Sequence, residues 1–317
     1  MTERSKIVVT GADGFVGRAL VEYLRERTTG EVVRCVRPGK AGPNDLAYDL
    51  AENGLLPALH DIDVIVHTAA RVHFLKVEDD PLPAFRAANV AGTIRLAEAA
   101  ADAGVRRFVF LSSIAANGNV TPIGQPFTPS DIPSPQNPYG VSKLEAEQAL
   151  LALSQRSTME VVIVRPTLVY GPGAGGNVQQ MLKWLRLGIP LPLADIHNRR
   201  SFVSLYNLVD LLALCTTHPA AGGEIFLAGD AEVVSTSTML SALARGLGRS
   251  PRLFWVPKPL LRMLATALGK RAWVDILYRS LTVDISKNSR LLGWSPPQSF
   301  DAGINATTQP ANKNLGK

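Results

Sequence analysis

The chain has 317 residues, of which 46% are hydrophobic and 19% charged, which is enough to bury a large core. This excludes a disordered or fibrous protein and suits one large domain or two domains that share an interface. The formal net charge of +6 is scattered rather than gathered in a basic run, so we expect anionic small molecules, and not nucleic acid, as partners.

The first residues and the two cysteines indicate in which cellular compartment the protein is expected. The segment MTERSK has mixed charge, and no stretch approaches the roughly 20 uninterrupted apolar residues of a membrane-spanning helix. Cys35 and Cys215 lie in separate apolar runs, where buried small side chains are more common than a disulfide or a metal pair. The basic amphipathic stretch 259–273 could lie on a membrane surface, although such a stripe more often packs on its own domain. We expect a cytoplasmic protein without a transmembrane segment or a metal site.

Short apolar runs alternate with amphipathic segments up to residue 170. The strand-like runs are 6–10, 31–36, 63–69, 107–113 and 161–169. The helix-like segments are 16–27, 85–104 and 139–153. This alternation predicts an α/β domain with a doubly wound parallel sheet, covered by helices on both faces.

The pattern loosens after Gly171, where glycine and proline interrupt the helices. We expect residues 171–306 to form a smaller lobe, intertwined with the first domain, and residues 307–317 to be a disordered tail. Open parallel sheets bind ligands at the carboxyl ends of their strands, so we expect a ligand cleft between the two lobes.

A glycine-rich loop, TGADGFVG, joins the first strand to the first helix. Glycine there permits a tight turn and close backbone approach, so that the helix N-terminus can meet a pyrophosphate. Such loops also serve packing, but this position in an alternating chain indicates a Rossmann NAD(P)-binding domain over residues 1–170. The loop residues that we expect beside the cofactor are Gly11, Gly14, Phe15, Val16 and Gly17.

The run 31–36 ends without the acidic residue that would bind a ribose 2′-hydroxyl, and it brings Arg34 and Arg37 instead. A guanidinium suits a 2′-phosphate, so the sequence favours NADP(H) and leaves NAD(H) as the alternative. The two arginines could equally be solvated surface charges. Asp49 is a candidate adenine contact, and the small residues that follow His67 could pass close to the cofactor or serve packing alone. We interpret His67 as a core histidine.

A serine pair and a tyrosine–lysine pair carry the candidate chemistry. Ser112 and Ser113 end the run 107–113, and a helix opens later with Tyr139 and Lys143. The i, i+4 spacing places phenol and ammonium on one helical face, where the ammonium should lower the phenol pKa from about 10. Such a tyrosine can pass a proton to or from a substrate oxygen. Either pair alone is common, but together behind a dinucleotide loop they predict an acid–base site.

A series of motifs across nearly the whole chain resembles the extended short-chain dehydrogenases/reductases, and within them the NAD-dependent epimerase/dehydratase family of nucleotide-sugar enzymes. The motifs are TGADGFVG, DL at Asp49, HTAA, NVAGT, SSIAANG, PYGVSK, RPTLVYGPG and NRRSFVSLYNLVD. The resemblance implies that Tyr139 is the catalytic acid–base, that Lys143 orients the cofactor ribose, and that Ser113 holds the reacting sugar oxygen. The further residues that it places beside the cofactor are Asp49, Leu50, Thr68, Ala69, Ala70, Asn89, Lys143, Pro166 and Leu168.

The same resemblance suggests a sugar site. Asn177 and Arg200 fall where relatives hold the nucleotide-sugar diphosphate, which suits the guanidinium fork, and Leu191 falls near the base. An exposed charge is the alternative for Arg200. Arg71 and His73 lie in a segment that departs from the usual epimerase sequence, and they are either substrate contacts or loop charges.

Two activities remain open. Ile114 and Ala115 stand where sugar 4,6-dehydratases carry an acidic pair, so the resemblance argues against dehydration. Our first hypothesis is NAD(P)H-dependent reduction of the C4 keto group of a UDP-2-acetamido-2,6-dideoxy-4-keto-hexose, forming UDP-N-acetylquinovosamine for surface polysaccharide. The alternative is a UDP-N-acetylglucosamine or UDP-glucose 4-epimerase with tightly bound NAD.

A different class of function is a non-catalytic cofactor sensor or RNA-binding relative, although such proteins generally lose the tyrosine or the lysine that this chain keeps. The resemblance also implies a homodimer that pairs through the helical segments 85–104 and 139–153.

Overall fold

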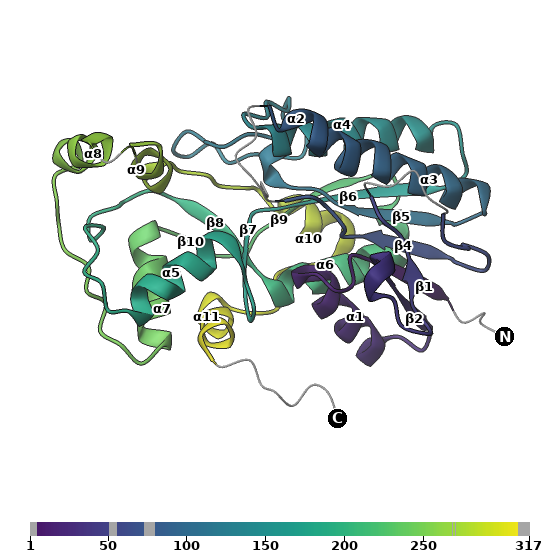
Figure 1. The fold of residues 1–317 in the computed structure, drawn as a ribbon, viewed down its shortest axis with the longest axis horizontal. Coiled ribbons are helices and arrows are strands. Elements are labelled where there is room, and N and C mark those ends of the chain that lie inside the picture. Colours follow the sequence, from purple (N-terminus) through teal and green to yellow (C-terminus); the bar gives the residue numbers. More distant parts are fainter. Residues whose placement is uncertain (1–4, 51–55, 73–79, 268, 270, 310–317) are drawn as a thin grey trace.

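The computed structural model describes residues 5–50, 56–72, 80–267, 269 and 271–309 (Figure 1). The larger sheet has the order β3-β2-β1-β4-β5-β6-β9, and all neighbouring strands are parallel. Its strands are β1 (Lys6–Thr10), β2 (Glu31–Val36), β3 (Leu46–Ala47), β4 (Val64–His67), β5 (Arg107–Leu111), β6 (Glu160–Pro166) and β9 (Ile225–Ala228). The predicted doubly wound parallel sheet is confirmed.

Helices cover both faces of this sheet (Figure 1). Helices α1 (Phe15–Arg27) and α6 (Leu205–Thr217) pack on one face, and α3 (Thr93–Asp102) and α4 (Pro138–Ser154) pack on the other. Strand side chains alternate between the two cores: Ile7 and Val9 join the core under α1, while Val8 joins the core under α3. Because both faces are buried, the strands read as continuous apolar runs.

The order of the strands reverses between β1 and β4. After β1 the chain builds β2 and β3 on one side, and β4 then starts the other side, with Thr10 and His67 as neighbours in register. Ligands of open α/β sheets bind outside the carboxyl ends of the strands at such a switch point. The glycine-rich loop and the segment Thr68–Ala70 both begin there.

One predicted helix, 85–104, starts and ends a few residues earlier and is less regular than the sequence suggested. The helical run starts with α2 (Leu82–Phe85), continues through a π-helical turn, η2 (Arg86–Gly92), and ends with α3. A π-helical turn inserts an extra residue, which re-aims side chains and is frequent at functional sites. Asn89 lies within this turn.

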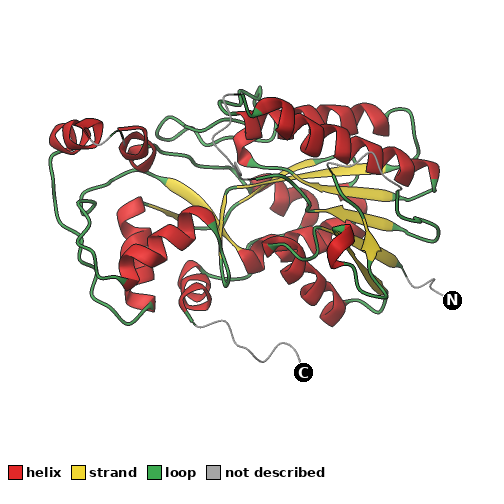
Figure 2. Cartoon of the chain, viewed as in Figure 1, coloured by secondary structure: helices red, strands yellow, loops and turns green. Residues whose placement is uncertain are grey.

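A smaller lobe holds a second sheet with the strand order β10-β8-β7 (Figure 2). Its strands are β7 (Leu168–Tyr170), β8 (Arg200–Ser204) and β10 (Val233–Val234). The helices beyond β7, apart from α6, are α5 (Gly176–Arg186), α7 (Thr236–Gly246), α8 (Lys258–Ala267), α9 (Arg271–Tyr278), α10 (Ser286–Leu292) and α11 (Phe300–Thr308). The lobe has its own core, which includes Tyr170, Phe202 and Phe300. The predicted disordered tail begins too early, because Thr307 and Thr308 are buried in the last turn of α11; residues 310–317 lie outside the described residues.

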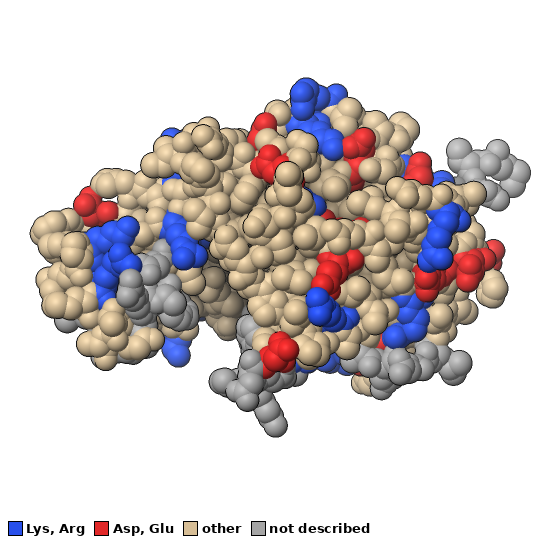
Figure 3. Space-filling model, turned by 90° about the horizontal axis from the view of Figure 1, so that it is seen from above, with Lys and Arg blue, Asp and Glu red and all other residues tan. Residues whose placement is uncertain are grey.

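Short helical turns complete the fold: η1 (Pro38–Lys40), η3 (Ile114–Ala116) and η4 (Pro219–Ala221). Cys35 in β2 and Cys215 in α6 are buried and unpaired, as predicted. Among the helices described, none combines the length and the apolar character that crossing a bilayer requires. Figure 3 shows lysine and arginine side chains interspersed with acidic ones on the face that carries α3 and α4, which agrees with the scattered charge of the sequence.

Candidate active site

The glycine-rich loop forms a backbone cradle at the switch point. Gly11 has φ 65°, and a Cβ atom on it would lie 2.8 Å from the backbone nitrogen of Ala69, so both the conformation and the space require glycine. The N-cap of α1, Gly14, offers no side-chain cap, and the first turn of α1 has no acidic residue. The N–H groups at this helix end therefore suit a phosphate, and the cradle fits a dinucleotide.

The segment that follows β4 lies on the other side of the switch point. The Thr68 hydroxyl donates to the Thr10 carbonyl at 2.6 Å, and Thr68, Ala69 and Ala70 are all half-buried. Asn89 ties the next residue to the π-helical turn: its Oδ1 accepts from the Arg71 backbone nitrogen at 2.8 Å, and its Nδ2 donates to the Arg71 carbonyl at 3.0 Å. Asn89 Nδ2 also donates to the Ser142 hydroxyl in α4 at 3.0 Å. Asn89 thus joins this segment to the helix of the candidate tyrosine.

Asp49 and Leu50 lie beyond β3, half-buried against the helical run that contains Asn89. The Asp49 carbonyl accepts from Arg95 at 3.1 Å. The backbone of Leu50 lies so close to Gly92 that a Cβ atom there would come within 2.4 Å of the Leu50 carbonyl oxygen. Backbone contacts therefore hold the Asp49–Leu50 segment in place, where we expect the adenine of the cofactor.

The two arginines of β2 have different surroundings. Arg34 pairs with Asp45 at 3.2 Å, whereas Arg37 follows the strand with 64% of its side chain exposed. Lys40, which the sequence reasoning missed, pairs with Asp13 of the glycine-rich loop at 2.8 Å, and Arg37 lies 3.9 Å from the same carboxylate. The hydrogen bond from Lys40 lowers the pKa of Asp13. Two cations therefore meet one carboxylate at the end of β2.

Ser113 and Tyr139 are brought together by close packing of α4 on η3. Asn137 caps α4 by accepting from the Gly140 backbone nitrogen at 2.7 Å. A Cβ atom on Gly140 would lie 2.4 Å from the Ala115 carbonyl oxygen, so glycine permits this approach. This packing brings the Ser113 side chain close enough to the Tyr139 phenol to lower its pKa through hydrogen bonding.

The protonation of Tyr139 corrects a prediction. We expected Lys143 to lower the pKa of the phenol, but burial raises it to about 12, and the hydrogen bond with Ser113 only partly opposes this. Lys143 is itself 1% exposed, and burial lowers its pKa to about 7, so its charge is incomplete at neutral pH. Tyr139 is consequently a proton donor in this state of the site.

Lys143 lies in an apolar setting with one acidic neighbour. Its Nζ is 4.0 Å from the centroid of the Phe110 ring, a cation–π contact from β5. Glu147, one turn later in α4, partly restores the pKa that burial lowers. The buried His67 is hydrogen-bonded to Thr10 and Thr93 through its two ring nitrogens, which confirms that it is a core histidine.

An aromatic contact extends the site toward the sugar side. Arg71 lies over the Phe85 ring at 5.7 Å, and Phe85 meets the Tyr139 ring edge-on at 6.0 Å. Sequence reasoning missed Phe85, because a lone phenylalanine at a helix start gives no signal. His73 lies outside the described residues.

The predicted diphosphate residues belong to the smaller lobe. Arg200 donates to the Ile276 carbonyl at 3.3 Å, while its buried Nε has no hydrogen-bond partner and burial lowers its pKa. An anion would satisfy such a group. Asn177 is exposed in the first turn of α5, whereas the side chain of Leu191 packs in the core of the lobe. Pro166 ends β6 and Leu168 begins β7, at the junction of the two sheets.

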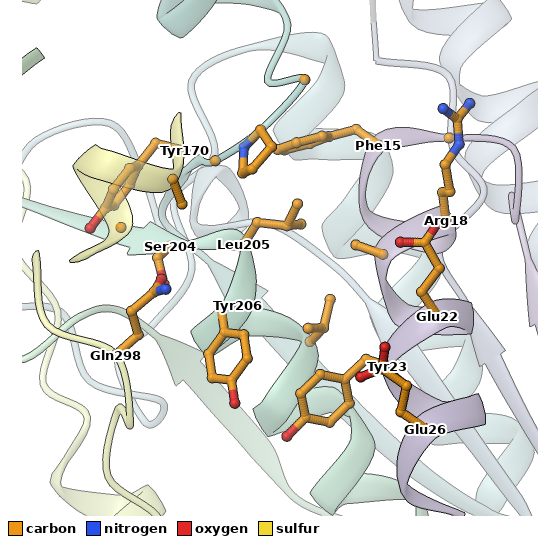
Figure 4. A pocket seen from close by; sticks show the side chains of 18 of the residues that line it. Phe15, Arg18, Glu22, Tyr23, Glu26, Tyr170, Ser204, Leu205, Tyr206 and Gln298 are labelled. Carbon is orange, nitrogen blue, oxygen red and sulfur yellow. The ribbon is translucent and has the colours of Figure 1, made fainter. Parts of the chain in front are cut away.

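A separate groove of about 530 Å³ lies on the other side of the glycine-rich loop, between α1, α6 and α11 (Figure 4). Phe15, Tyr23 and Tyr206 line it, and Ser113, Tyr139 and Lys143 do not. Within the part of the chain described, no three His, Cys, Asp or Glu side chains gather as a metal site would require. The candidate catalytic side chains Ser113, Tyr139 and Lys143 lie near the carboxyl ends of the strands, away from this groove.

A dinucleotide cradle at the switch point, with a hydroxyl, a phenol and an ammonium at the neighbouring strand end, defines a nicotinamide-dependent oxidoreductase. Comparison with known proteins narrows this class. The chain belongs to the NAD dependent epimerase/dehydratase family, whose model matches residues 7–229. The predictions of an enzyme and of the extended short-chain dehydrogenase/reductase family are thereby confirmed.

Three similar proteins illustrate the range of this family. The chain is 41% identical to a UDP-glucose 4-epimerase of Vibrio cholerae over 310 residues, which cover 96% of this chain and 94% of that protein. It is 30% identical to a GDP-6-deoxy-D-mannose reductase of Pseudomonas aeruginosa over 236 residues, covering 70% and 73%. Its fold matches that of MoeE5 in complex with UDP-glucuronic acid and NAD, with TM-score 0.76, 26% identity and coverage of 96% and 98%. Nucleotide-sugar epimerases and reductases are thus both among its relatives.

Proposed function

We propose that the protein reduces the C4 keto group of a UDP-2-acetamido-2,6-dideoxy-4-keto-hexose with NAD(P)H. The observation that carries this proposal is the close packing of α4 on η3, which places the buried Tyr139 phenol beside Ser113, where burial raises the phenol pKa to about 12. A phenol that keeps its proton at neutral pH is suited to protonate a carbonyl oxygen as negative charge develops on it. Reduction of a ketone requires that donation, which a protonated Tyr139 can make.

Each side chain of the site then has one task. The cradle at Gly11 and the N-terminus of α1 hold the pyrophosphate, and Lys143 holds the ribose hydroxyls. When bound, the nicotinamide ring supplies the hydride. The Ser113 hydroxyl fixes the position of the sugar oxygen, and Tyr139 donates its proton to that oxygen.

The sugar nucleotide would lie between the two lobes. The unsatisfied Nε of Arg200 supports binding of the diphosphate, and the exposed Asn177 at the start of α5 is a second candidate contact. Arg71, held by Asn89 and stacked over Phe85, would face the sugar from the opposite lobe. The names of the relatives, which refer to UDP-glucose and UDP-glucuronic acid, support a UDP-sugar as substrate.

NADP(H) is the cofactor that the end of β2 favours. Arg37 and Lys40 present two cations there, and a 2′-phosphate could replace the Asp13 carboxylate between them. Arg34 contributes less than we first expected, because Asp45 already neutralises it. NAD(H) remains the alternative, since it needs neither cation.

A 4-epimerase is the second candidate, and the name of the relative at 41% identity favours it. The same residues serve both directions: Tyr139 would first take the C4 hydroxyl proton and later return it. The two activities differ in whether the cofactor is consumed or retained.

The deciding experiment supplies the purified protein with NADPH or NADH and a UDP-4-keto-6-deoxy-N-acetylhexosamine that a dehydratase makes in place. We expect loss of the near-ultraviolet absorbance of the reduced nicotinamide in proportion to the sugar reduced. Tyr206→Phe is the matched control for Tyr139→Phe, because Tyr206 lies in the separate groove. Interconversion of UDP-N-acetylglucosamine and its 4-epimer without added cofactor would instead establish the epimerase.

A homodimer through α3 and α4 remains a prediction. Exposed ion pairs, Arg86 with Glu145 and Arg156 with Glu98, lie on or next to these helices. Sedimentation equilibrium would test it, and a monomer at assay concentrations would contradict it.

A further inference from the structure

A buried ion pair lies directly behind the candidate catalytic groups. Glu147 is 1% exposed and Arg165 is 2% exposed. Arg165 Nε lies 3.0 Å and 3.1 Å from the two carboxylate oxygens of Glu147, and a second guanidinium nitrogen contacts the same carboxylate. The Ser112 hydroxyl also donates to Glu147. The Glu147 carboxylate thus accepts hydrogen bonds from both Arg165 and Ser112.

The network continues to the loop that carries Ser113. Another guanidinium nitrogen of Arg165 donates to Asn117 Oδ1 at 2.9 Å. Asn117 immediately follows η3, and its carbonyl accepts from the backbone nitrogen of Ser134 at 2.9 Å, just before α4 begins. The segments on both sides of the site are therefore tied to one guanidinium.

Each partner in the network lies next to a group that the proposed function uses. Ser112 precedes Ser113, Arg165 precedes Pro166, and Glu147 follows Lys143 by one helical turn. Taking two charges out of water is expensive, and an apolar pair of similar size would often be as stable. The position of the ion pair therefore indicates a role in the site rather than in stability alone.

We propose that Glu147 is a positioning residue: it fixes α4 against the ends of β5 and β6 and supplies the negative charge that keeps Lys143 protonated. This inference rests on the proposed function, because it assigns Lys143 to the bound cofactor.

The surroundings of Lys143 leave Glu147 as its acidic neighbour among the described residues. From β4, His67 interacts with Lys143, but its pKa is lowered to about 3, so it stays neutral. From β6, Arg165 reaches the region only through its pair with Glu147, and β5 contributes the uncharged Phe110 ring. Tyr139, one turn earlier in α4, is protonated at neutral pH. Loss of the Glu147 charge should accordingly favour neutral Lys143.

The test compares Glu147→Gln with Glu145→Gln. Glu145 lies two residues away in α4 and pairs with Arg86 at the surface, so it is a matched control. We would measure the dissociation constant of NADPH and of NADH by cofactor fluorescence across neutral pH. Cofactor affinity should fall with rising pH as Lys143 loses its proton. The pH at which half of this affinity change has occurred, the midpoint, should be lower by about one unit in Glu147→Gln. Glu145→Gln should keep the wild-type midpoint.

The double variant Glu147→Gln/Arg165→Gln separates charge from folding. It leaves no uncompensated buried charge, so it carries the test if Glu147→Gln alone does not fold. We expect the midpoint to move in the same direction as in the single variant but by less, because removal of the Arg165 cation opposes the loss of the Glu147 charge. Glu147→Asp, which keeps the charge, should return the midpoint toward wild type. A wild-type midpoint in every folded variant that lacks the Glu147 carboxylate, or an equal shift in Glu145→Gln, would overturn the proposal.

This measurement needs no sugar, so it is independent of which sugar is reduced. A protein that binds reduced cofactor with the expected shifts but leaves every sugar unchanged would support the role of Glu147 and contradict the proposed reaction. Normal sugar reduction, together with a wild-type midpoint in the folded Gln variants, would support the proposed reaction and contradict the role of Glu147.

Discussion

Two clusters of opposite charges lie near the candidate site, and they differ in burial. Behind the catalytic groups, Glu147 and Arg165 are almost fully buried. At the end of β2, Asp13 meets Lys40 and Arg37, whose side chains are 55% and 64% exposed. The chemistry of the partners is similar, but the surrounding medium is not.

This difference in burial determines how the loss of a charge in each cluster affects folding and ligand binding. In the buried cluster water cannot replace a lost partner, so removing one charge leaves the other uncompensated, and the geometry of the site depends on the pair. At the exposed cluster water and salt screen the charges, so changes there alter ligand preference with little effect on folding. The predictions that follow test this contrast, from the largest expected effect to the smallest.

Tyr139→Phe should lower kcat for sugar reduction by about 10³-fold, within the range for loss of a general acid. The aromatic packing with Phe85 and the fold should survive, because the ring is kept. Steady-state rates with circular dichroism as the folding control measure this. A variant with nearly wild-type kcat would remove Tyr139 from the mechanism.

Arg165→Ala should lower the free energy of unfolding by about 3–5 kcal/mol, since it leaves the Glu147 carboxylate buried and unpaired. Arg86→Ala, which breaks the exposed pair with Glu145, should change it by no more than about 1 kcal/mol. Urea denaturation curves of both variants give the comparison. Equal losses would show that burial does not distinguish the two pairs.

Lys143→Met should stabilise the protein at neutral pH by about 2 kcal/mol, because it removes a desolvated ammonium. The pKa of Lys143 is lowered to about 7 in the folded protein, below its value in the unfolded chain. Between these two values the unfolded chain binds the proton and the folded protein does not, so the wild type gains stability as pH rises. The advantage of Lys143→Met should therefore shrink toward alkaline pH, which thermal unfolding at several pH values would reveal.

Arg37→Ala and Lys40→Ala should each weaken NADPH binding by about 5–10-fold while leaving NADH almost unchanged. Asp13→Asn should strengthen NADPH binding a few-fold, because it removes the competing carboxylate. Lys6→Ala, which breaks the Lys6–Glu31 pair at the other end of the same strands, is the control. Fluorescence titrations at two salt concentrations should show the preference fading with salt; equal losses for NADH and NADPH would mean that neither cation reads the 2′-phosphate.

Much of the site could be predicted because its signals are local. The loop glycines lie within seven consecutive residues, and Tyr139 and Lys143 are one helical turn apart, so spacing alone indicates their geometry. Partners that come from distant segments left no such signal. Lys40 lies 27 residues from Asp13, and Asn117 lies 48 residues from Arg165.

The sequence by itself determined the parallel α/β fold, the cradle at Gly11 and the segment that carries Tyr139 and Lys143, because side-chain periodicity and glycine geometry act over a few residues. Only the tertiary structure decided the charge states within that site. Lys143 does not lower the pKa of Tyr139 as its spacing suggested, because both groups are buried and the loss of water outweighs their mutual attraction. Desolvation depends on everything that packs around a group, and packing joins segments that are far apart in the chain.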